Sequence, residues 1–379
     1  MTTSPAVATH PFGFRDATGA DIDALVDLEN RCFDIDRLTR RSFNWMIKKA
    51  NCSLELICDK DQIIGYVLVL YHRGTHLARL YSLAVDPAYR GHHLGSTLLR
   101  RAEERAVSRR CVFMRLEVHT NNTQAIRLYE SHDYRRFGQF EDYYEDHADA
   151  FRYQKRILIT DNEKGLIQMP YYAQSTEFTC GPAALMMAMS GLEPTIVPER
   201  SLELQLWREA TTIYMTSGHG GCSPLGLALA AWHRGFAVSV YVNSRAPLFT
   251  DGVRNEEKKT ILKLVHEDFL QQIRDTDIKL VYREVTVPVL TRALEQGKVP
   301  LVMISSWRFN KTKSPHWVTI SGIDDDFVYI HDPEIDEENH RYPMDNIHLP
   351  VARDIFEKAF RFGVSGLRTC VIISRREAP

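Results

Sequence analysis

Residues 83–96 read Leu-Ala-Val-Asp-Pro-Ala-Tyr-Arg-Gly-His-His-Leu-Gly-Ser and connect two expected elements of the fold. We expect a strand over 76–85 and a helix over about 95–107. Gly91 and Gly95 let the backbone approach a ligand closely, and the free N–H groups at a helix N-terminus attract anions. Taken alone, this loop predicts either a phosphate site or a simple tight turn between a strand and a helix.

The sequence on both sides of the loop predicts an α/β domain of about 155 residues, for which we set the bounds 1–156. Helical spacing of apolar residues is found within 20–50, and the following strands form a hairpin. The remaining elements alternate between helix and strand, as in a sheet flanked by helices. The expected strands are 54–58, 63–71, 76–85, 112–119 and a stretch from Tyr134 onward, and the further helix is 123–131.

The order of these elements, with Leu116-Glu117-Val118 and Asn122 after the loop, resembles the GNAT family of N-acetyltransferases. Within that family it is similar to the ribosomal-protein alanine N-acetyltransferases, over about residues 13–156. The resemblance implies acetyl-CoA as co-substrate, held between two splayed strands. The implied cofactor-binding residues are Leu83 and Val85, whose backbone pairs with the pantetheine arm, the pyrophosphate loop Arg90, Gly91, His92, His93, Leu94, Gly95 and Ser96, and also Asn122.

Acetyl transfer to an amine requires two proton transfers, because the arriving ammonium must lose a proton and the departing thiolate must gain one. The resemblance implies that Glu117 is the base, through water, and that Tyr129 is the acid. Without it, Glu117 reads as a solvated strand carboxylate and Tyr129 as a core aromatic residue. The pair Tyr143-Tyr144 matches aromatic residues that shape the family's peptide groove. His93 departs from the family's usual glycine or alanine, and its imidazole either crowds the phosphate or, if charged, assists its binding.

The second half of the chain, residues 168–379, follows a short polar connector at 157–167. Helices are expected from Cys180 to Gly191, after Ser223-Pro224, over 256–273 and over 288–296. Apolar strands follow over 300–305, 316–322, 327–332 and 367–374. Helices that precede strands favour an α+β fold.

One cysteine of this half stands where a nucleophile is expected. The stretch 174–182, Gln-Ser-Thr-Glu-Phe-Thr-Cys-Gly-Pro, places Cys180 in the first turn of an apolar helix, where the helix dipole favours the thiolate. His316 opens a strand and Asp332 ends the next one. Adjacent antiparallel strands bring these two residues together, which completes a Cys-His-Asp relay.

This pattern resembles the papain-like bacteriocin-processing cysteine peptidases over about residues 168–375. The resemblance implies Gln174 as the oxyanion residue, Cys180 as nucleophile, His316 as base and Asp332 as the orienting residue. Two features differ from that family: no fused membrane transporter is visible, and a charged insertion lengthens the spacing between Cys180 and His316. Cys222 also begins a helix and is a second candidate nucleophile, but no glutamine precedes it.

Composition excludes several classes of protein. Of 379 residues, 47 are Lys or Arg and 49 are Asp or Glu, and this net charge of -2 argues against a protein that coats nucleic acid. No run of 18 apolar residues predicts a membrane span, and no signal peptide is visible. Seven scattered cysteines without a CxxC pair argue against a disulfide framework or a zinc ribbon. We therefore expect a cytoplasmic protein without a metal.

The sequence thus predicts a bifunctional enzyme that acetylates an amine, as at a peptide or protein N-terminus, and hydrolyses a peptide bond through Cys180. If both sites act on one peptide, cleavage exposes an amine that acetylation then caps. Three alternatives stay open: the second domain only binds peptides, it is a deamidase or transpeptidase, or the first domain senses CoA and regulates the second. Neither the oligomeric state nor the natural substrate follows from the sequence.

Overall fold

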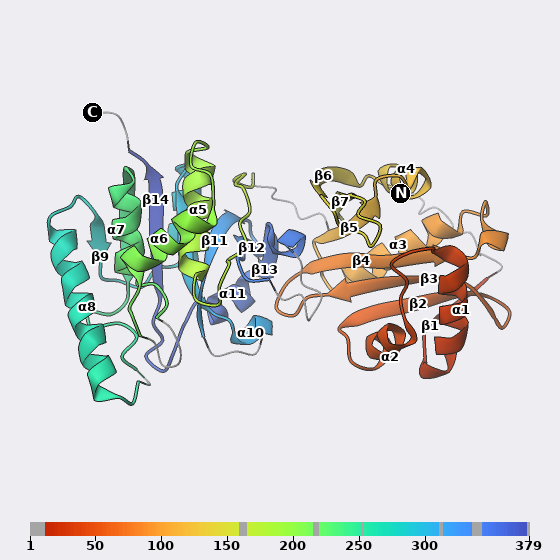
Figure 1. Cartoon of the computed structure of the whole chain (residues 1–379), viewed down its shortest axis with the longest axis horizontal. Helices are drawn as coiled ribbons and strands as arrows, with labels where there is room; N and C mark the ends of the chain where they lie inside the picture. The colour runs from red at the N-terminus through yellow and green to blue at the C-terminus, as the bar shows by residue number, and fades with distance from the viewer. Residues whose placement is uncertain are drawn as a thin grey trace, which may run out of the picture. The chain divides into compact units, whose positions relative to one another are not determined.

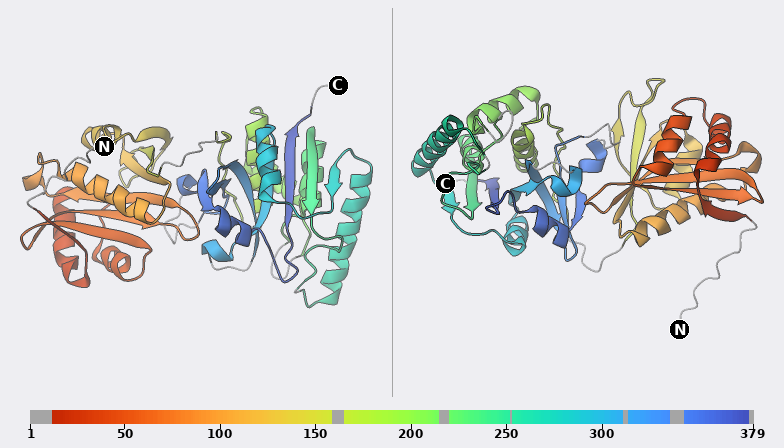
Figure 2. Two further views of the ribbon diagram at one scale, coloured as in Figure 1. Left: turned by 180° about the vertical axis from the view of Figure 1, so that it is seen from behind. Right: turned by 90° about the horizontal axis from the view of Figure 1, so that it is seen from below.

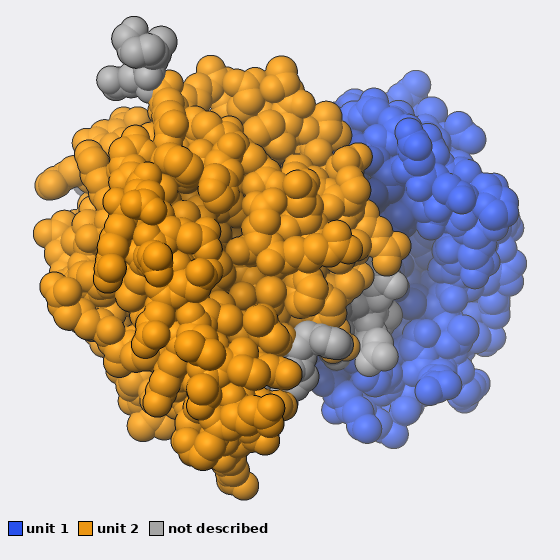
Figure 3. Space-filling model, turned by 60° about the vertical axis from the view of Figure 1, so that its left-hand side comes forward, with its two compact units in different colours: residues 1–72, 76–159 blue, residues 73–75, 160–379 orange. Residues whose placement is uncertain are grey.

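The computed structural model describes residues 12–158, 165–214, 220–251, 253–310, 314–335 and 343–376 (Figures 1 and 2). The chain divides into two compact units, drawn in different colours in Figure 3. The first comprises residues 1–72 and 76–159, and the second comprises 73–75 and 160–379. Most of the predicted connector, residues 159–164, lies outside the described residues.

The first unit is built on a seven-stranded sheet in the order β1-β2-β3-β4-β5-β7-β6, in which β4 and β5 are parallel and the other pairs antiparallel. Two apolar cores form, one under α1 and α2 and the other under α3 and α4. This arrangement confirms the expected mixed sheet flanked by helices. The elements are β1 Gly13–Asp16, α1 Ile22–Cys32, α2 Arg40–Lys48, β2 Cys52–Asp59, β3 Gln62–Tyr71, β4 Leu77–Val85, α3 Leu94–Ser108, β5 Phe113–His119, α4 Thr123–Glu130, β6 Arg135–Phe140 and β7 Ala150–Arg156, with short 3₁₀ turns at Gly19–Asp21 and Pro87–Tyr89.

Strands β4 and β5 separate part-way along their length, and this separation positions the first site. Their pairing runs only from Leu77 opposite Phe113 to Arg79 opposite Arg115. A register shift between β3 and β4 leaves Tyr81 as an extra residue, which is the signature of a β-bulge. Bulges bend a strand, so β4 continues along β3 while its other edge leaves β5. The edge that carries Leu83 and Val85 is therefore not paired with β5.

The second unit contains another seven-stranded sheet, in the order β13-β12-β11-β10-β14-β8-β9, in which β8 and β9 are the parallel pair. The apolar helices α5 and α7 lie in its largest core, and α5 packs against β10, β11 and β14. Mixed sheet and helices confirm the α+β expectation. The elements are α5 Cys180–Leu192, α6 Arg200–Ala210, α7 Pro224–His233, β8 Phe236–Val242, α8 Glu256–Arg274, β9 Lys279–Val281, α9 Val287–Glu295, β10 Val299–Ser305, α10 Trp307–Asn310, β11 Pro315–Ile323, β12 Phe327–His331, β13 Leu349–Ala352, α11 Arg353–Ala359 and β14 Thr369–Arg375, with a 3₁₀ turn at Pro343–Asn346.

Two kinds of feature are absent from the described part of the chain. None of its helices is both long and apolar enough to cross a bilayer. No group of three or more His, Cys, Asp or Glu side chains in it is arranged to hold a metal ion.

Candidate active sites

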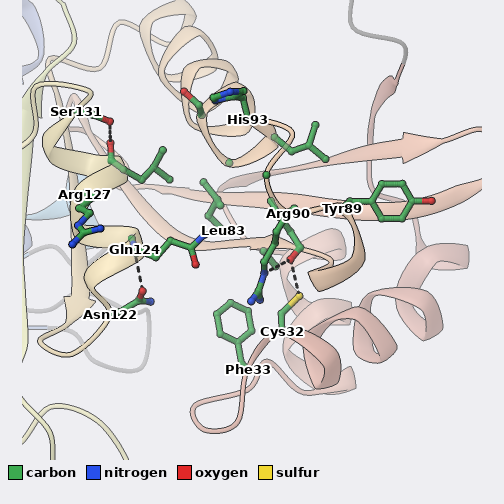
Figure 4. A pocket seen from close by; sticks show the side chains of 18 residues that line it. Cys32, Phe33, Leu83, Tyr89, Arg90, His93, Asn122, Gln124, Arg127 and Ser131 are labelled. Carbon is green, nitrogen blue, oxygen red and sulfur yellow. Dashed lines mark hydrogen bonds between the residues drawn. The ribbon is translucent and has the colours of Figure 1, made fainter.

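A cavity of about 700 Å³ opens where β4 leaves β5 (Figure 4). Nine of the ten residues expected to bind acetyl-CoA line it, and His92 does not. In Figure 4, Arg90 lies near Cys32 and Phe33 at the end of α1. Asn122, Gln124 and Arg127 come from the start of α4. The lining residues are Cys32, Phe33, Leu83, Ala84, Val85, Tyr89, Arg90, Gly91, His93, Leu94, Gly95, Ser96, Asn122, Gln124, Ala125, Arg127, Leu128 and Ser131.

The loop that follows β4 has the backbone expected of an anion cradle. Gly91 has φ +87° and His93, which immediately precedes α3, has φ +56°. These left-handed residues turn the chain so that α3 begins with its N-terminus at the cavity. The His93 side chain is exposed, so its imidazole does not fill the cradle. The Ser96 hydroxyl lies 2.6 Å from His132 Nε2, which joins the start of α3 to the end of α4.

We expect His93→Gly to raise the melting temperature and to change the Kd for acetyl-CoA by less than about twofold. A left-handed non-glycine residue is strained by about 1 kcal/mol, and glycine relieves this strain. Thermal unfolding and calorimetric titration measure the two effects, with His92→Ala as the control for loss of an exposed neighbouring imidazole. A tenfold weaker affinity in His93→Gly alone would show instead that this imidazole helps to hold the phosphates.

The expected base, Glu117, forms a buried ion pair that the sequence did not predict. Arg79 Nη2 lies 2.9 Å from Glu117 Oε2, and the side chains of Arg79 and Glu117 are 2% and 6% exposed. The same nitrogen donates to the Tyr143 hydroxyl at 2.9 Å. The ion pair holds the Glu117 carboxylate against β4. An arginine within the apolar stretch 77–81 was the available signal for this pair.

The expected acid, Tyr129, is buried on α4, and burial raises its pKa, which favours the protonated hydroxyl. Among the described residues, no hydrogen bond joins its hydroxyl to the protein. Burial raises the pKa of the Tyr144 hydroxyl, and the charge of Glu117 and then Tyr129 raise it further. Tyr144 therefore lies near both the expected base and the expected acid. Its ring also packs on His119, with ring centroids 5.0 Å apart. The structure therefore groups Glu117, Tyr129 and Tyr144 around one region.

The second site lies where α5 begins beside the sheet. Cys180 is the first residue of α5, His316 lies near the start of β11, and Asp332 immediately follows β12. His316 Nε2 and Asp332 Oδ1 are 2.6 Å apart, and both residues are buried. Cys180 lies close enough to His316 to raise the pKa of that imidazole. The fold thus brings Cys180 beside His316 and Asp332, which lie more than 130 residues further along the chain.

The charge state of His316 follows from these contacts. Burial is the largest single effect and lowers its pKa, whereas the Asp332 carboxylate and then Cys180 raise it. The net result is a pKa well above the usual value, so His316 is held as an imidazolium. The Cys180 sulfur thus lies beside a positive charge at the N-terminus of α5. The arrangement supports nucleophilic chemistry by Cys180.

Comparison with protein families agrees with this geometry. A family model described as Peptidase_C39 like family matches residues 169–374, which is more than half of the chain. The chain belongs to this family. A second model, described as Acetyltransferase (GNAT) family, matches residues 22–134. The first unit therefore carries a GNAT domain and the second a Peptidase_C39 like domain.

Two curated relatives each match about a third of the chain or less. An uncharacterized protein of Mycobacterium leprae is 32% identical over 146 residues, 35% of this chain and 38% of that protein. N-alpha-acetyltransferase 30 of Dictyostelium discoideum is 33% identical over 109 residues, 28% of this chain and 57% of that protein. The match thus spans well under two thirds of either relative. A crystal structure of a ribosomal-protein alanine N-acetyltransferase from Escherichia coli is 22% identical, with a TM-score of 0.37, over 41% of this chain and 99% of that one.

In the Peptidase_C39 like domain, the predicted oxyanion residue Gln174 lies in a segment that is hydrogen-bonded to the residues just after β12. Its backbone N–H donates to Pro333 O at 2.9 Å, and the nearby Tyr171 hydroxyl donates to Asp332 O at 2.9 Å. These bonds hold the segment beside the residues that orient His316. The side-chain oxygen of Gln174 is buried.

Glu203, for which the sequence predicted no role, accepts two hydrogen bonds from the same segment. This fully buried carboxylate in the first turn of α6 accepts the Tyr172 hydroxyl at 2.9 Å and Ser175 N–H at 2.8 Å. The donors lie on both sides of Gln174 in the sequence. A glutamate at helical spacing among apolar residues gave no sequence signal for this role, because the surface of a helix carries such residues routinely.

Cys222, the second candidate nucleophile, is a packing residue of the Peptidase_C39 like domain. It is 3% exposed, and burial, followed by the nearby Cys180, raises its pKa well above the usual value. A Cβ on Gly181 would lie 2.9 Å from the Cys222 Cβ, so glycine after the nucleophile allows α5 to pack here. The Cys222 carbonyl accepts the Trp317 indole N–H at 3.1 Å. Both the neutral thiol and the burial argue against nucleophilic chemistry at Cys222.

Proposed function

We propose that the protein is bifunctional: the GNAT domain transfers an acetyl group from acetyl-CoA to the amine of a peptide or protein N-terminus, and the Peptidase_C39 like domain hydrolyses a peptide bond through Cys180. The contact of His316 with both Cys180 and Asp332 is the observation that carries the hydrolase assignment. The cradle at the start of α3, next to the unpaired edge of β4, supports the acetyltransferase assignment.

In the acetyl site, acetyl-CoA supplies the acetyl group. Backbone N–H groups at the start of α3 hold its phosphates, and the free edge at Leu83 and Val85 pairs with its amide-containing arm. Glu117, which Arg79 holds in place, binds the substrate ammonium, an anchoring role that differs from the base implied by the resemblance. Tyr129 donates a proton to the departing CoA sulfur. The chain thus binds acetyl-CoA, orients the substrate amine and protonates the departing sulfur.

In the thiol site, the Cys180 sulfur attacks the peptide carbonyl carbon while the Gln174 amide stabilises the oxyanion. The C–N bond then breaks, His316 gives its proton to the leaving amine, and a thioester to Cys180 remains. Neutral His316 next removes a proton from water, the resulting hydroxide attacks the thioester, and the acid product leaves. Asp332 holds the His316 ring in place throughout.

We expect Asp332→Asn to lower kcat for peptide hydrolysis by about 10²-fold or more. The same change removes the charge that raises the His316 pKa, so the imidazolium is lost at lower pH. Hydrolysis needs that imidazolium as acid. The alkaline pH at which activity is lost should therefore lie closer to neutral in the variant than in the wild type. A pH profile of kcat/KM measures the shift. An alkaline limb at the same pH in both proteins would mean that Asp332 does not control His316.

Release of free CoA thiol tests the acetyltransferase assignment. The purified chain is mixed with acetyl-CoA and short peptides that begin with alanine, serine, glycine or methionine, and the thiol is followed with a chromogenic disulfide. Peptides whose amine is already acetylated serve as the control. We expect at least one free-amine peptide to accelerate release and its blocked form not to. Equal slow release with every peptide would overturn the assignment.

Alkylation of the native protein by iodoacetamide near pH 6 separates a catalytic Cys180 from a domain that only binds peptides. At this pH ordinary thiols are protonated and react slowly, whereas a thiolate paired with His316 reacts rapidly. Peptide mapping by mass spectrometry identifies the labelled cysteine. Rapid labelling of Cys180 supports the hydrolase, and labelling no faster than at the partly exposed Cys32 would favour the binding module.

A further inference from the structure

A row of three hydrogen-bonded side chains in the GNAT domain runs from β4 through β3 to α1. Ser82 Oγ lies 2.7 Å from the Tyr66 hydroxyl, which lies 2.5 Å from Glu29 Oε2. Tyr66 is completely buried and Glu29 is 2% exposed, whereas Ser82 is half-buried. Neither the sequence resemblance nor the catalytic roles proposed above use these residues. A carboxyl group buried this deeply in an apolar core requires a reason.

The chemistry of the groups fixes the direction of the hydrogen bonds. An ionised carboxylate only accepts, so the Tyr66 hydroxyl donates to Glu29. A tyrosine hydroxyl has a single hydrogen, so the Ser82 hydroxyl donates to Tyr66. The Ser82 oxygen is then left with acceptor capacity at the half-exposed end. A proton accepted there can pass inward by one shift along each hydrogen bond.

The row lies beside the cavity that we assign to acetyl-CoA. Ser82 stands between the bulged Tyr81 and Leu83, where β4 has already left β5. Ala84 lies two residues further on the same face of the strand and lines the cavity. Glu29 lies one helical turn before Cys32, which also lines it. Ser82 is not itself a lining residue, but the next two residues, Leu83 and Ala84, are, so the half-exposed end of the row lies at the edge of the cavity.

We infer that Ser82, Tyr66 and Glu29 form a relay that removes the proton from the substrate amine, an inference that rests on the proposed acetyltransferase function. The ammonium N–H bond breaks and its proton passes to the Ser82 oxygen, while the Ser82 hydrogen moves to Tyr66 and the Tyr66 hydrogen to Glu29. The products are a neutral amine and a protonated Glu29. The amine lone pair then attacks the thioester carbon, and Glu29 returns its proton to solvent between turnovers.

The electrostatics of Glu29 suit this role better than those of Glu117. Glu117 is paired with a guanidinium at 2.9 Å. Burial is the main effect on Glu29 and raises its pKa, although the Tyr66 hydroxyl, the Leu38 N–H and the Arg37 charge act in the opposite direction. Cys32, on the same helix, faces it as well. A carboxylate with a raised pKa is a stronger base at neutral pH.

Tyr66→Phe breaks the relay while it keeps the ring in the core. We expect kcat/KM for acetylation of the peptide panel to fall by about 10-fold to 100-fold at pH 7. The deficit should vanish near pH 9.5, because an α-amino group with a pKa of about 8 is then already deprotonated and needs no base. Tyr71→Phe is the matched control. It removes another buried hydroxyl of β3, which pairs with Ser53 at 2.9 Å, and we expect the wild-type profile.

The outcomes separate the relay from the proposed function. If the wild-type protein acetylates no peptide of the panel, the acetyltransferase proposal fails and the relay with it. If the wild type acetylates and Tyr66→Phe does so equally at pH 7, the relay alone fails. A deficit in Tyr66→Phe of equal size at pH 7 and pH 9.5 also overturns it, because a merely structural hydroxyl would act at every pH.

Thermal unfolding of Glu29→Gln without any substrate provides a second readout. A carboxyl whose pKa is higher in the folded than in the unfolded state destabilises the fold progressively as pH rises from about 4.3 through the folded value. We expect the wild type to lose stability in this window relative to Glu29→Gln. A constant difference in melting temperature between pH 4 and pH 8 would show that Glu29 does not hold protons as the relay requires.

Discussion

Cys180→Ala should abolish peptide hydrolysis, with a fall in rate of about 10³-fold or more. The nucleophile forms the thioester, and neither of its two partners can replace it, since in the proposed mechanism His316 transfers protons and Asp332 holds the His316 ring. Acetylation by the GNAT domain should be unchanged, because Cys180 has no part in that site. Cleavage of a peptide panel, followed by mass spectrometry, measures the first effect and CoA thiol release the second.

Cys222→Ala is the matched control for this change. Both cysteines lie at helix starts in the same core, but Cys222 has a raised pKa and no histidine contact among the described residues. We expect its cleavage rate to stay within about threefold of the wild type. A fall of similar size in both variants would contradict the assignment of Cys180 as nucleophile and point to loss of packing between α5 and α7.

Tyr129→Phe should lower kcat for acetylation by about 10²-fold, because the CoA thiolate would then leave without a proton donor. The KM for acetyl-CoA should stay within about threefold, since Tyr129 is not among the residues that line the cavity. Burial raises the Tyr129 pKa, so the wild-type hydroxyl keeps its proton, and kcat should show no loss from this group up to pH 10. Steady-state kinetics with varied acetyl-CoA separate the two parameters.

Tyr134→Phe controls for the loss of a buried hydroxyl near Tyr129. The two rings pack with centroids 5.8 Å apart, and Tyr134 is equally buried. We expect a kcat close to that of the wild type. If Tyr134→Phe lost as much activity as Tyr129→Phe, or if Tyr129→Phe raised only KM, Tyr129 would be a packing residue and not the acid.

Much of the fold follows from local sequence signals. The helix expected after Ser223-Pro224 is found as α7, with the Ser223 hydroxyl accepting Leu225 N–H at 3.1 Å, and α8 begins at the expected Glu256. The helical stretch expected within 20–50 is two helices, interrupted where Asp36 takes φ +52°. The strand β8 was not expected, although Phe236–Val242 has an alternating pattern of burial. It inserts beside β14, far along the chain, and such pairing leaves no local signal.

The candidate sites were predictable where their residues lie in compact motifs. The loop from Arg90 to Ser96 and the helix start at Cys180 are visible in the sequence, and the family resemblances imply their roles. The partners Arg79 and Glu203 could not, because each acts by a contact that only the tertiary fold creates. Arg79 meets Glu117 because β4 and β5 run side by side at that level. Buried polar contacts of this kind depend on register between distant segments, which composition and periodicity do not encode.

We propose that one chain carries two separate peptide-directed activities. The most direct measurement incubates the wild-type protein with acetyl-CoA and a diverse peptide panel, and reads all products by mass spectrometry beside Cys180→Ala and Tyr129→Phe. We predict acetylated N-termini and cleaved fragments with the wild type, loss of only the fragments with Cys180→Ala, and strong loss of only the acetylation with Tyr129→Phe. Peptides that remain unchanged with the wild type, or both products lost in either single variant, would contradict it.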